Sequence, residues 1–188
     1  MHTKIIFIYL SLASIIICMS GCVMQHDSNE EVNTLVKLSL NEMLFYPERL
    51  RDSTFKPQYK YVVYSDSTEC SSCRISHLGI WNYFRNSLYD NNAGLYIIFS
   101  PPKEMIPNMQ KVHDSYKHRI PIYIDTLGVF MRDNPQIAGK TSKFHCFLLD
   151  ENNKIVVIGD VSKNHNVRDE IFRILEKNAD STVIENHP

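Results

Sequence analysis

The chain has 188 residues, and its 20 lysine and arginine residues nearly balance 21 aspartate and glutamate residues, which gives a formal net charge of −1. A chain without a basic excess or a Lys/Arg cluster is not expected to bind nucleic acid or to reach a membrane through a polybasic patch. Its length suffices for one sizeable hydrophobic core and is short for two, so we expect a single globular domain.

The N-terminus has the pattern of a bacterial secretion signal. Lys4 precedes an apolar run over residues 5–17, which is short for a bilayer span and suits the apolar region of a signal peptide. The run leads into Met19-Ser20-Gly21-Cys22, which resembles the lipobox of lipoproteins. An ordinary cleaved signal or a short uncleaved anchor is the alternative. We expect residues 1–21 to be removed and Cys22 to carry lipid. The protein would then be anchored in the bacterial cell envelope outside the cytoplasm, on the periplasmic face or at the outer membrane.

Residues 22–58 are expected to form a tether and an N-terminal helical extension. Residues 23–31 are polar and lack periodicity, as in a flexible tether. Residues 48–58 are charged and predict a connecting loop. A short amphipathic helix that ends before Pro47 is predicted between them from its apolar positions, Val32, Leu35, Leu38 and Met43.

From residue 59 onward, strand and helix patterns alternate up to a closing hairpin and helix. The predicted elements are strand 59–65, helix 70–89, strand 94–100, helix 103–117 and strand 120–125. Apolar residues recur at helical spacing in the first helix and predict its buried face: Ile75, Leu78, Trp81, Phe84 and Leu88. Two apolar runs, 144–149 and 154–158, flank a short polar turn and predict an antiparallel hairpin. A final helix is expected to start near Asn166, and residues 179–188 are predicted to form a polar tail.

The segment Cys70-Ser71-Ser72-Cys73 lies between the first strand and the first helix of this alternation. Two cysteines three apart at a helix start can close a small disulfide ring, and the helix N-terminus favours the thiolate of Cys70, the form that attacks disulfides. No second half of a zinc site follows. With Cys18 removed in the signal peptide and Cys22 lipidated, Cys146 is left over. One pair plus one leftover thiol is typical of a redox couple.

This order of elements, with C-x-x-C between the first strand and its helix, resembles the thioredoxin fold over about residues 59–178. It resembles most the membrane-tethered TlpA-type proteins of bacteria. Residues 121–125 followed by Gly128 are similar to their third strand and its turn, and residues 147–150 and 154–156 to their fourth and fifth strands. The expected fold class is therefore α/β and thioredoxin-like, with a central mixed sheet, flanking helices and a C-terminal hairpin plus helix.

The resemblance implies a thiol–disulfide oxidoreductase that acts on protein thiols and disulfides without a cofactor. Cys70 would attack, Cys73 would resolve the mixed disulfide, and the oxidised form would hold a Cys70–Cys73 disulfide. Tyr64 stands where thioredoxin has a buried acid, and Asp66 could replace that acid only if it pointed inward. Residues 136–146 contain no proline, so Phe144 or His145 stands where the fold normally has a cis-proline.

Two other functions remain open on the sequence. Cys70 and Cys73 with His145 or Cys146 could form a Cu(I) site, similar in principle to the Sco-type copper proteins. His77 is another candidate ligand, although a solvent-facing role is the plainer expectation for it. Cys146 is expected to be a small buried residue in a strand. The third possibility is a non-catalytic thioredoxin-like binding module that keeps the disulfide as a staple.

Overall fold

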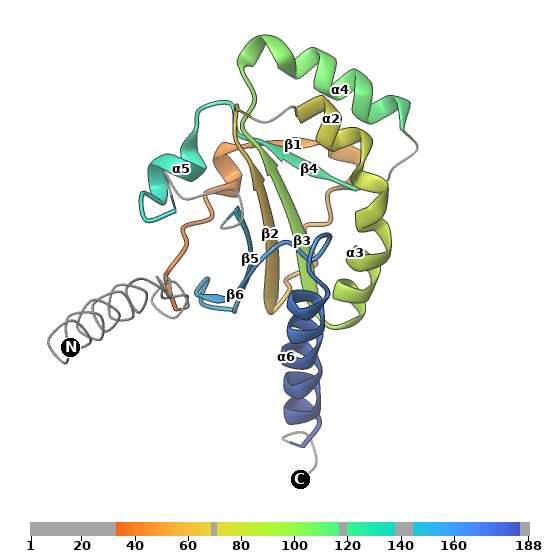
Figure 1. The fold of residues 1–188 in the computed structure, drawn as a ribbon, viewed down its shortest axis with the longest axis vertical. Helices are drawn as coiled ribbons and strands as arrows, with labels where there is room; N and C mark the ends of the chain where they lie inside the picture. The colour runs from red at the N-terminus through yellow and green to blue at the C-terminus, as the bar shows by residue number, and fades with distance from the viewer. Residues whose placement is uncertain (1–32, 69–70, 117–119, 138–144, 185–188) are drawn as a thin grey trace, which may run out of the picture. The chain divides into compact units, whose positions relative to one another are not determined.

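The structure is a computed structural model that describes residues 33–68, 71–116, 120–137 and 145–184. These residues fall in one compact unit, Glu31–Pro188. Its centre is a six-stranded mixed sheet with the order β1-β4-β3-β2-β5-β6 (Figure 1). The strands are β1 (Leu44–Tyr46), β2 (Tyr59–Ser65), β3 (Ala93–Phe99), β4 (Ile122–Ile124), β5 (Cys146–Leu149) and β6 (Ile155–Ile158). β2, β3 and β4 run parallel, whereas β1, β5 and β6 pair antiparallel with their neighbours.

Helices cover both faces of this sheet. The α-helices are α2 (Ser71–Ser76), α3 (Trp81–Asp90), α4 (Ile106–Ser115), α5 (Val129–Asp133) and α6 (His165–Ile184). The described residues also form short 3-10 turns: η1 (Leu40–Glu42), η2 (Glu48–Leu50), η3 (Leu78–Ile80) and η4 (Lys103–Met105). No helix within the described residues is both long enough and apolar enough to cross a bilayer.

Two hydrophobic cores form because successive residues of a strand point to opposite faces. Tyr61 and Val63 of β2 belong to the first core, which also contains buried residues of α2, α3, α4 and α6. Val62 and Tyr64 belong to the second core, together with residues of α5 and of the N-terminal segment. The central strand β2 is therefore buried on both sides, as its nearly continuous run of valine and tyrosine predicts.

The N-terminal segment differs from the predicted helical extension. Residues 33–43 contain the 3-10 turn η1 rather than an amphipathic helix, and β1 follows as an edge strand paired with β4. The N–H of Val36 donates to the Asn153 carbonyl at 2.8 Å, so pairing with the hairpin satisfies this backbone instead of helical bonds. Val36 and Met43 are buried in the second core. Residues before 59 therefore contribute to the same core as residues of the predicted domain, whose boundary at residue 59 stays a prediction.

Two predicted helices are interrupted and one is longer than expected. Helix 70–89 divides into α2, η3 and α3, and Gly79, a poor helix former, lies in the 3-10 turn between the two α-helices. The predicted buried face is confirmed, since Ile75, Leu78, Trp81, Phe84 and Leu88 are all buried. Helix 103–117 begins with η4 and ends at Ser115. Helix α6 continues to Ile184, so the tail predicted from residue 179 is largely helical in its backbone.

The predicted hairpin is confirmed. β5 and β6 pair antiparallel, and the Asp150 carboxylate accepts the N–H groups of Asn152 and Lys154, each at 2.9 Å. Asn153 takes a left-handed conformation with φ 61°, which asparagine tolerates better than most residues. These local bonds fix the turn at the position where the sequence places its polar run.

Candidate thiol site

Cys73 lies on α2, the short helix that follows the C-terminal end of β2. Its side chain is exposed, and its sulfur is disulfide-bonded. Its carbonyl accepts a hydrogen bond from the Ser76 hydroxyl at 2.6 Å, near the point where α2 ends. Glu69 and Cys70 lie outside the described residues. The predicted Cys70–Cys73 pairing therefore stays a prediction.

Asp66 in the turn before α2 serves a local structural role. Its carboxylate accepts the N–H of Thr68 at 2.8 Å and the Thr68 hydroxyl at 2.6 Å. This arrangement is an Asx turn, in which an aspartate side chain stabilises the two residues that follow it. Asp66 therefore orders the loop that leads from β2 to α2.

Tyr64, at the position of the family's buried acid, is an uncharged member of the second core. Its ring stacks on Phe130 with centroids 4.7 Å apart, and the His145 ring meets it edge-on at 5.5 Å. Burial raises the pKa of Tyr64 to about 12, so the phenol keeps its proton at neutral pH. It supplies no carboxylate to accept a proton from a thiol.

Asp125, just after β4, is a buried carboxylate whose role the sequence did not suggest. Only 1% of Asp125 is exposed, and its two oxygens accept the N–H groups of Val129 and Phe130, both at 2.8 Å. These N–H groups open α5, a helix missing from the sequence prediction. Gly128 precedes it in a left-handed conformation with φ 64°. The aspartate therefore caps α5. In the sequence, the spacing Asp-x-x-Gly was the signal that could have predicted this cap.

His145 and Cys146 are neighbours in sequence but face opposite sides of the sheet. Cys146 is the first residue of β5, lies opposite Val63 of β2 and is buried in the first core, which confirms its expected burial in a strand. The ring of His145 packs instead on Tyr64, a member of the second core. The two side chains therefore contact different cores, and a copper site that includes either of them stays a prediction.

The described residues contain no group of three or more His, Cys, Asp or Glu side chains placed to hold a metal ion. His77, the other candidate ligand, is exposed as expected. Cys70 lies outside this part of the chain, so a copper site that includes it stays a prediction.

No protein-family model and no curated protein matches the sequence. Among solved structures, the chain is similar to a cysteine-to-serine mutant of PrxQ from Xylella fastidiosa, at 11% identity and a TM-score of 0.50, over 79% of this chain and 96% of that one. It also matches a putative thiol:disulfide interchange protein DsbE from Chlorobium tepidum, at 15% identity and a TM-score of 0.49, over 65% and 84% of the two chains. A third match is an uncharacterised thioredoxin-like protein from Porphyromonas gingivalis, at 15% identity and a TM-score of 0.43, over 73% and 82%.

At these identities, structural similarity establishes the fold and not the activity. The strand order, the helices on both faces and the closing hairpin with α6 agree with the fold expected from the sequence. The chain has a thioredoxin-like fold.

Proposed function

We propose that the protein is a lipid-anchored, extracytoplasmic thiol–disulfide oxidoreductase of the TlpA type, with Cys70 and Cys73 as its redox pair. The observation that carries the proposal is the place of Cys73, which is exposed and disulfide-bonded on the helix that follows β2. In a thioredoxin-like fold, this loop-to-helix junction is open to a partner protein. The C-x-x-C spacing supplies a second thiol three residues earlier in the sequence.

The proposed reaction moves two electrons between thiol pairs. The Cys70 thiolate attacks one sulfur of a substrate disulfide, forms a mixed disulfide and releases the other substrate sulfur as a thiolate. The Cys73 thiolate then attacks the Cys70 sulfur. The substrate leaves as a dithiol after taking up two protons, and the Cys70–Cys73 disulfide remains. An external dithiol must reduce this disulfide before the next cycle.

The surroundings of Cys73 bear on how its proton moves. Tyr64 keeps its proton at neutral pH, and Asp66 is engaged by Thr68. Because Cys73 is exposed, its thiol can release a proton directly to water. The proposed mechanism therefore needs no buried acid behind the cysteine pair.

The second part of the proposal is a lipid anchor at the N-terminus. Residues 1–21 would act as a signal peptide, and lipid on Cys22 would hold the domain at a membrane, since acyl chains bury their methylene groups in the bilayer. The thioredoxin-like domain would then meet its partners outside the cytoplasm.

The test uses the full-length chain in mild detergent with dithiothreitol as the recycling dithiol and insulin as the test disulfide. Wild type should reduce insulin, and Cys70→Ser should abolish the activity. Cys73→Ser should accumulate a mixed disulfide with the substrate, because the resolving thiol is missing. Cys146→Ala is the matched control and should keep the activity, since Cys146 lies in the first core.

The same preparation distinguishes copper binding from disulfide exchange. The reduced protein is titrated with Cu(I) against a competing chelator. If it holds one Cu(I) per chain tightly and reduces no insulin, the oxidoreductase proposal is wrong. If it shows neither copper binding nor insulin reduction, the disulfide is a staple in a binding module.

A further inference from the structure

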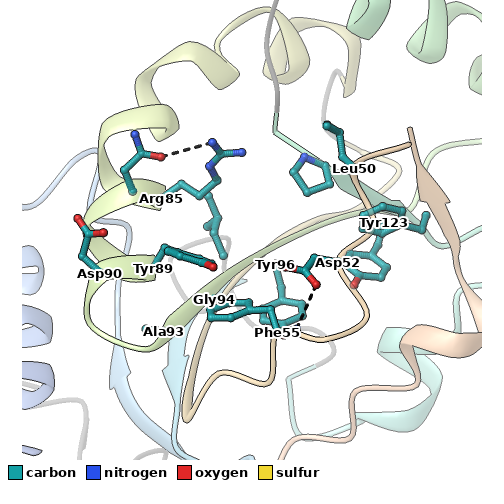
Figure 2. Close-up of a pocket in the computed structure, with 14 residues that line it drawn as sticks. Leu50, Asp52, Phe55, Arg85, Tyr89, Asp90, Ala93, Gly94, Tyr96 and Tyr123 are labelled. Carbon is teal, nitrogen blue, oxygen red and sulfur yellow. Dashed lines mark hydrogen bonds between the residues drawn. The ribbon is translucent and has the colours of Figure 1, made fainter. Parts of the chain in front are cut away.

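A hollow of about 440 Å³ lies between α3 and the segment that joins β1 to β2 (Figure 2). Its volume falls in the range of pockets that hold small ligands. Residues from five separate parts of the chain supply its aromatic lining: Phe45, Phe55, Tyr89, Tyr96 and Tyr123. The hollow is not part of the thiol site.

The aromatic rings hold one another in place. Tyr96 and Tyr123 stack with centroids 6.0 Å apart, and Phe45 meets Tyr123 edge-on at 5.1 Å. On the α3 side, Phe55 and Tyr89 lie 4.6 Å apart. Burial raises the pKa of Tyr96 to about 12, so its hydroxyl stays a hydrogen-bond donor at neutral pH. Such walls favour a ligand with an aromatic or apolar group.

Beside the hollow, β3 has an open edge. β4 pairs only with the C-terminal part of β3, where Ile98 lies opposite Tyr123 and Phe99 opposite Ile124. Pro121, one residue before β4, lines the hollow and has no N–H, so it cannot extend the ladder as a donor. The N-terminal half of β3 therefore extends beyond Ile122, the first residue of β4.

The backbone of Leu95 faces this open edge. The Phe99 carbonyl accepts the N–H of Asp125 at 2.7 Å, so the polar backbone groups of Phe99 point toward β4. These groups alternate along a strand, so those of Leu95, four residues earlier, point the same way. Among the described residues, no hydrogen bond reaches Leu95 from that side. Its N–H and carbonyl can pair with an added strand.

The charges at the hollow favour a basic ligand group. Asp52 and Asp90 contribute two carboxylates, against one guanidinium from Arg85. Asp90 lies exposed at the end of α3 and makes no ion pair within the described residues. Arg85 donates to the Asn86 side chain at 3.4 Å. A lysine or arginine on the ligand would balance the excess negative charge.

We propose that this hollow binds an extended peptide segment, which adds to the open edge of β3 and places an aromatic side chain between the tyrosine walls, with a lysine or arginine close to Asp90. Backbone pairing along a sheet edge with pockets for alternate side chains is a known way to recognise peptides. Of the chemistries that suit an aromatic hollow, an extended peptide is the one that also uses the unpaired backbone groups of Leu95.

This site lies at the other end of the sheet from Cys73. Ala93 of β3 lies opposite Tyr59, the first residue of β2, whereas α2 follows Ser65, its last residue. Six residues of extended strand separate the two ends by about 20 Å. Binding in the hollow therefore goes beyond the proposed redox function and can be tested separately from it.

The probe is an acetylated and amidated heptapeptide with a central tyrosine, valine and threonine on either side, and one lysine. Binding to the full-length chain in mild detergent is measured by titration calorimetry. We expect saturable binding, reduced at least tenfold by Tyr89→Ala. Tyr83→Ala is the matched control, because Tyr83 is an exposed tyrosine on the same helix outside the hollow, and it should not change the affinity.

A second pair of measurements tests strand addition. Methylation of the peptide's backbone nitrogens on its β3-facing side should reduce the affinity at least tenfold, as should Leu95→Pro, which removes the donor at the edge. The methylated peptide needs no change in the protein, so the test does not depend on that variant folding. Replacing the lysine with glutamate should weaken binding a few-fold at low salt.

The proposal is wrong if the heptapeptide shows no saturable binding up to a few millimolar. It is also wrong if p-cresol binds as tightly as the peptide and backbone methylation has no effect, since the hollow would then recognise only a ring. If Tyr83→Ala and Tyr89→Ala lower the affinity for the heptapeptide equally, the peptide does not bind in the hollow and the proposal is wrong.

Discussion

The Tyr61 hydroxyl donates a 2.7 Å hydrogen bond to the Gly159 carbonyl, 98 residues further along the chain. The same hydroxyl accepts the N–H of Val161 at 3.1 Å. One phenol of the central strand β2 thus fixes the connection between β6 and α6 while its ring packs in the first core.

Tyr61→Phe should lower the free energy of unfolding by about 1–3 kcal/mol, because the Gly159 carbonyl and the Val161 N–H would lose a buried partner. Urea unfolding followed by circular dichroism measures the change. Tyr83→Phe alters an exposed tyrosine and should have almost no effect. Equal stability of the two variants would mean that water replaces the lost hydroxyl.

Gly159→Ala should destabilise the fold more than Gly128→Ala. Gly159 has φ 145°, and a Cβ there would lie 2.7 Å from Cγ2 of Val167. Gly128 has φ 64°, but nothing lies within 4 Å of its added Cβ. We expect about 1–2 kcal/mol for Gly128→Ala from backbone strain alone and about 2–4 kcal/mol for Gly159→Ala from strain plus overlap. The reverse order in thermal unfolding would contradict this account.

Asp133 should make the fold sensitive to strong acid. Hydrogen bonds from Ser39 at 2.8 Å and from Lys37 lower the pKa of Asp133 from 3.8 to about 2. A carboxylate whose pKa is lowered on folding stabilises the folded state above pH 3.8, and this contribution is lost as the pH falls toward 2. Ser39→Ala should raise the pKa of Asp133 and reduce this loss.

The loss is measured as the difference in urea midpoint between about pH 5 and about pH 2. Ser115→Ala is the control, because the Ser115 hydroxyl donates to the Val112 carbonyl and to no carboxylate. If Ser39→Ala and wild type lose the same stability in acid, Asp133 is not responsible.

Cys146 should react slowly with a maleimide in the native oxidised protein and rapidly in urea. Its side chain is 2% exposed at the start of β5, so a reagent reaches the thiol only through local or global opening. Mass spectrometry over time gives both rates. Native labelling as fast as that of an unfolded chain would place the thiol at the surface and revive its role as a ligand or resolving cysteine.

Cys22→Ser should release the protein from membranes or leave it unprocessed. The wild-type protein should sediment with membranes and carry acyl groups on Cys22, because Met19-Ser20-Gly21-Cys22 has the lipobox pattern. Fractionation and mass spectrometry of the mature N-terminus measure both properties. An unmodified N-terminus at another residue would disprove the anchor.

Sequence patterns determined the parts of the fold that are stabilised locally. Apolar runs predicted β2 and β3, and the polar turn at Asp150 predicted the hairpin, all of which the structure contains. The helical spacing from Ile75 to Leu88 predicted a buried helical face, which α2, η3 and α3 share. These elements have their own periodicity, so few distant contacts are needed to recognise them. The thioredoxin-like fold followed from their order.

Tertiary contacts determined the elements that local sequence patterns did not predict. β1 forms because residues 44–46 pair with β4, and α5 forms because the buried Asp125 accepts its first N–H groups. Neither segment is long enough to show a periodicity of its own. The register of β5 on β2 places Cys146 opposite Val63, and the aromatic hollow gathers side chains from five separate segments. The sequence thus specified the order of the elements and the cysteine pair, whereas packing placed the side chains around the sheet, since pairing and burial depend on residues far apart in the chain.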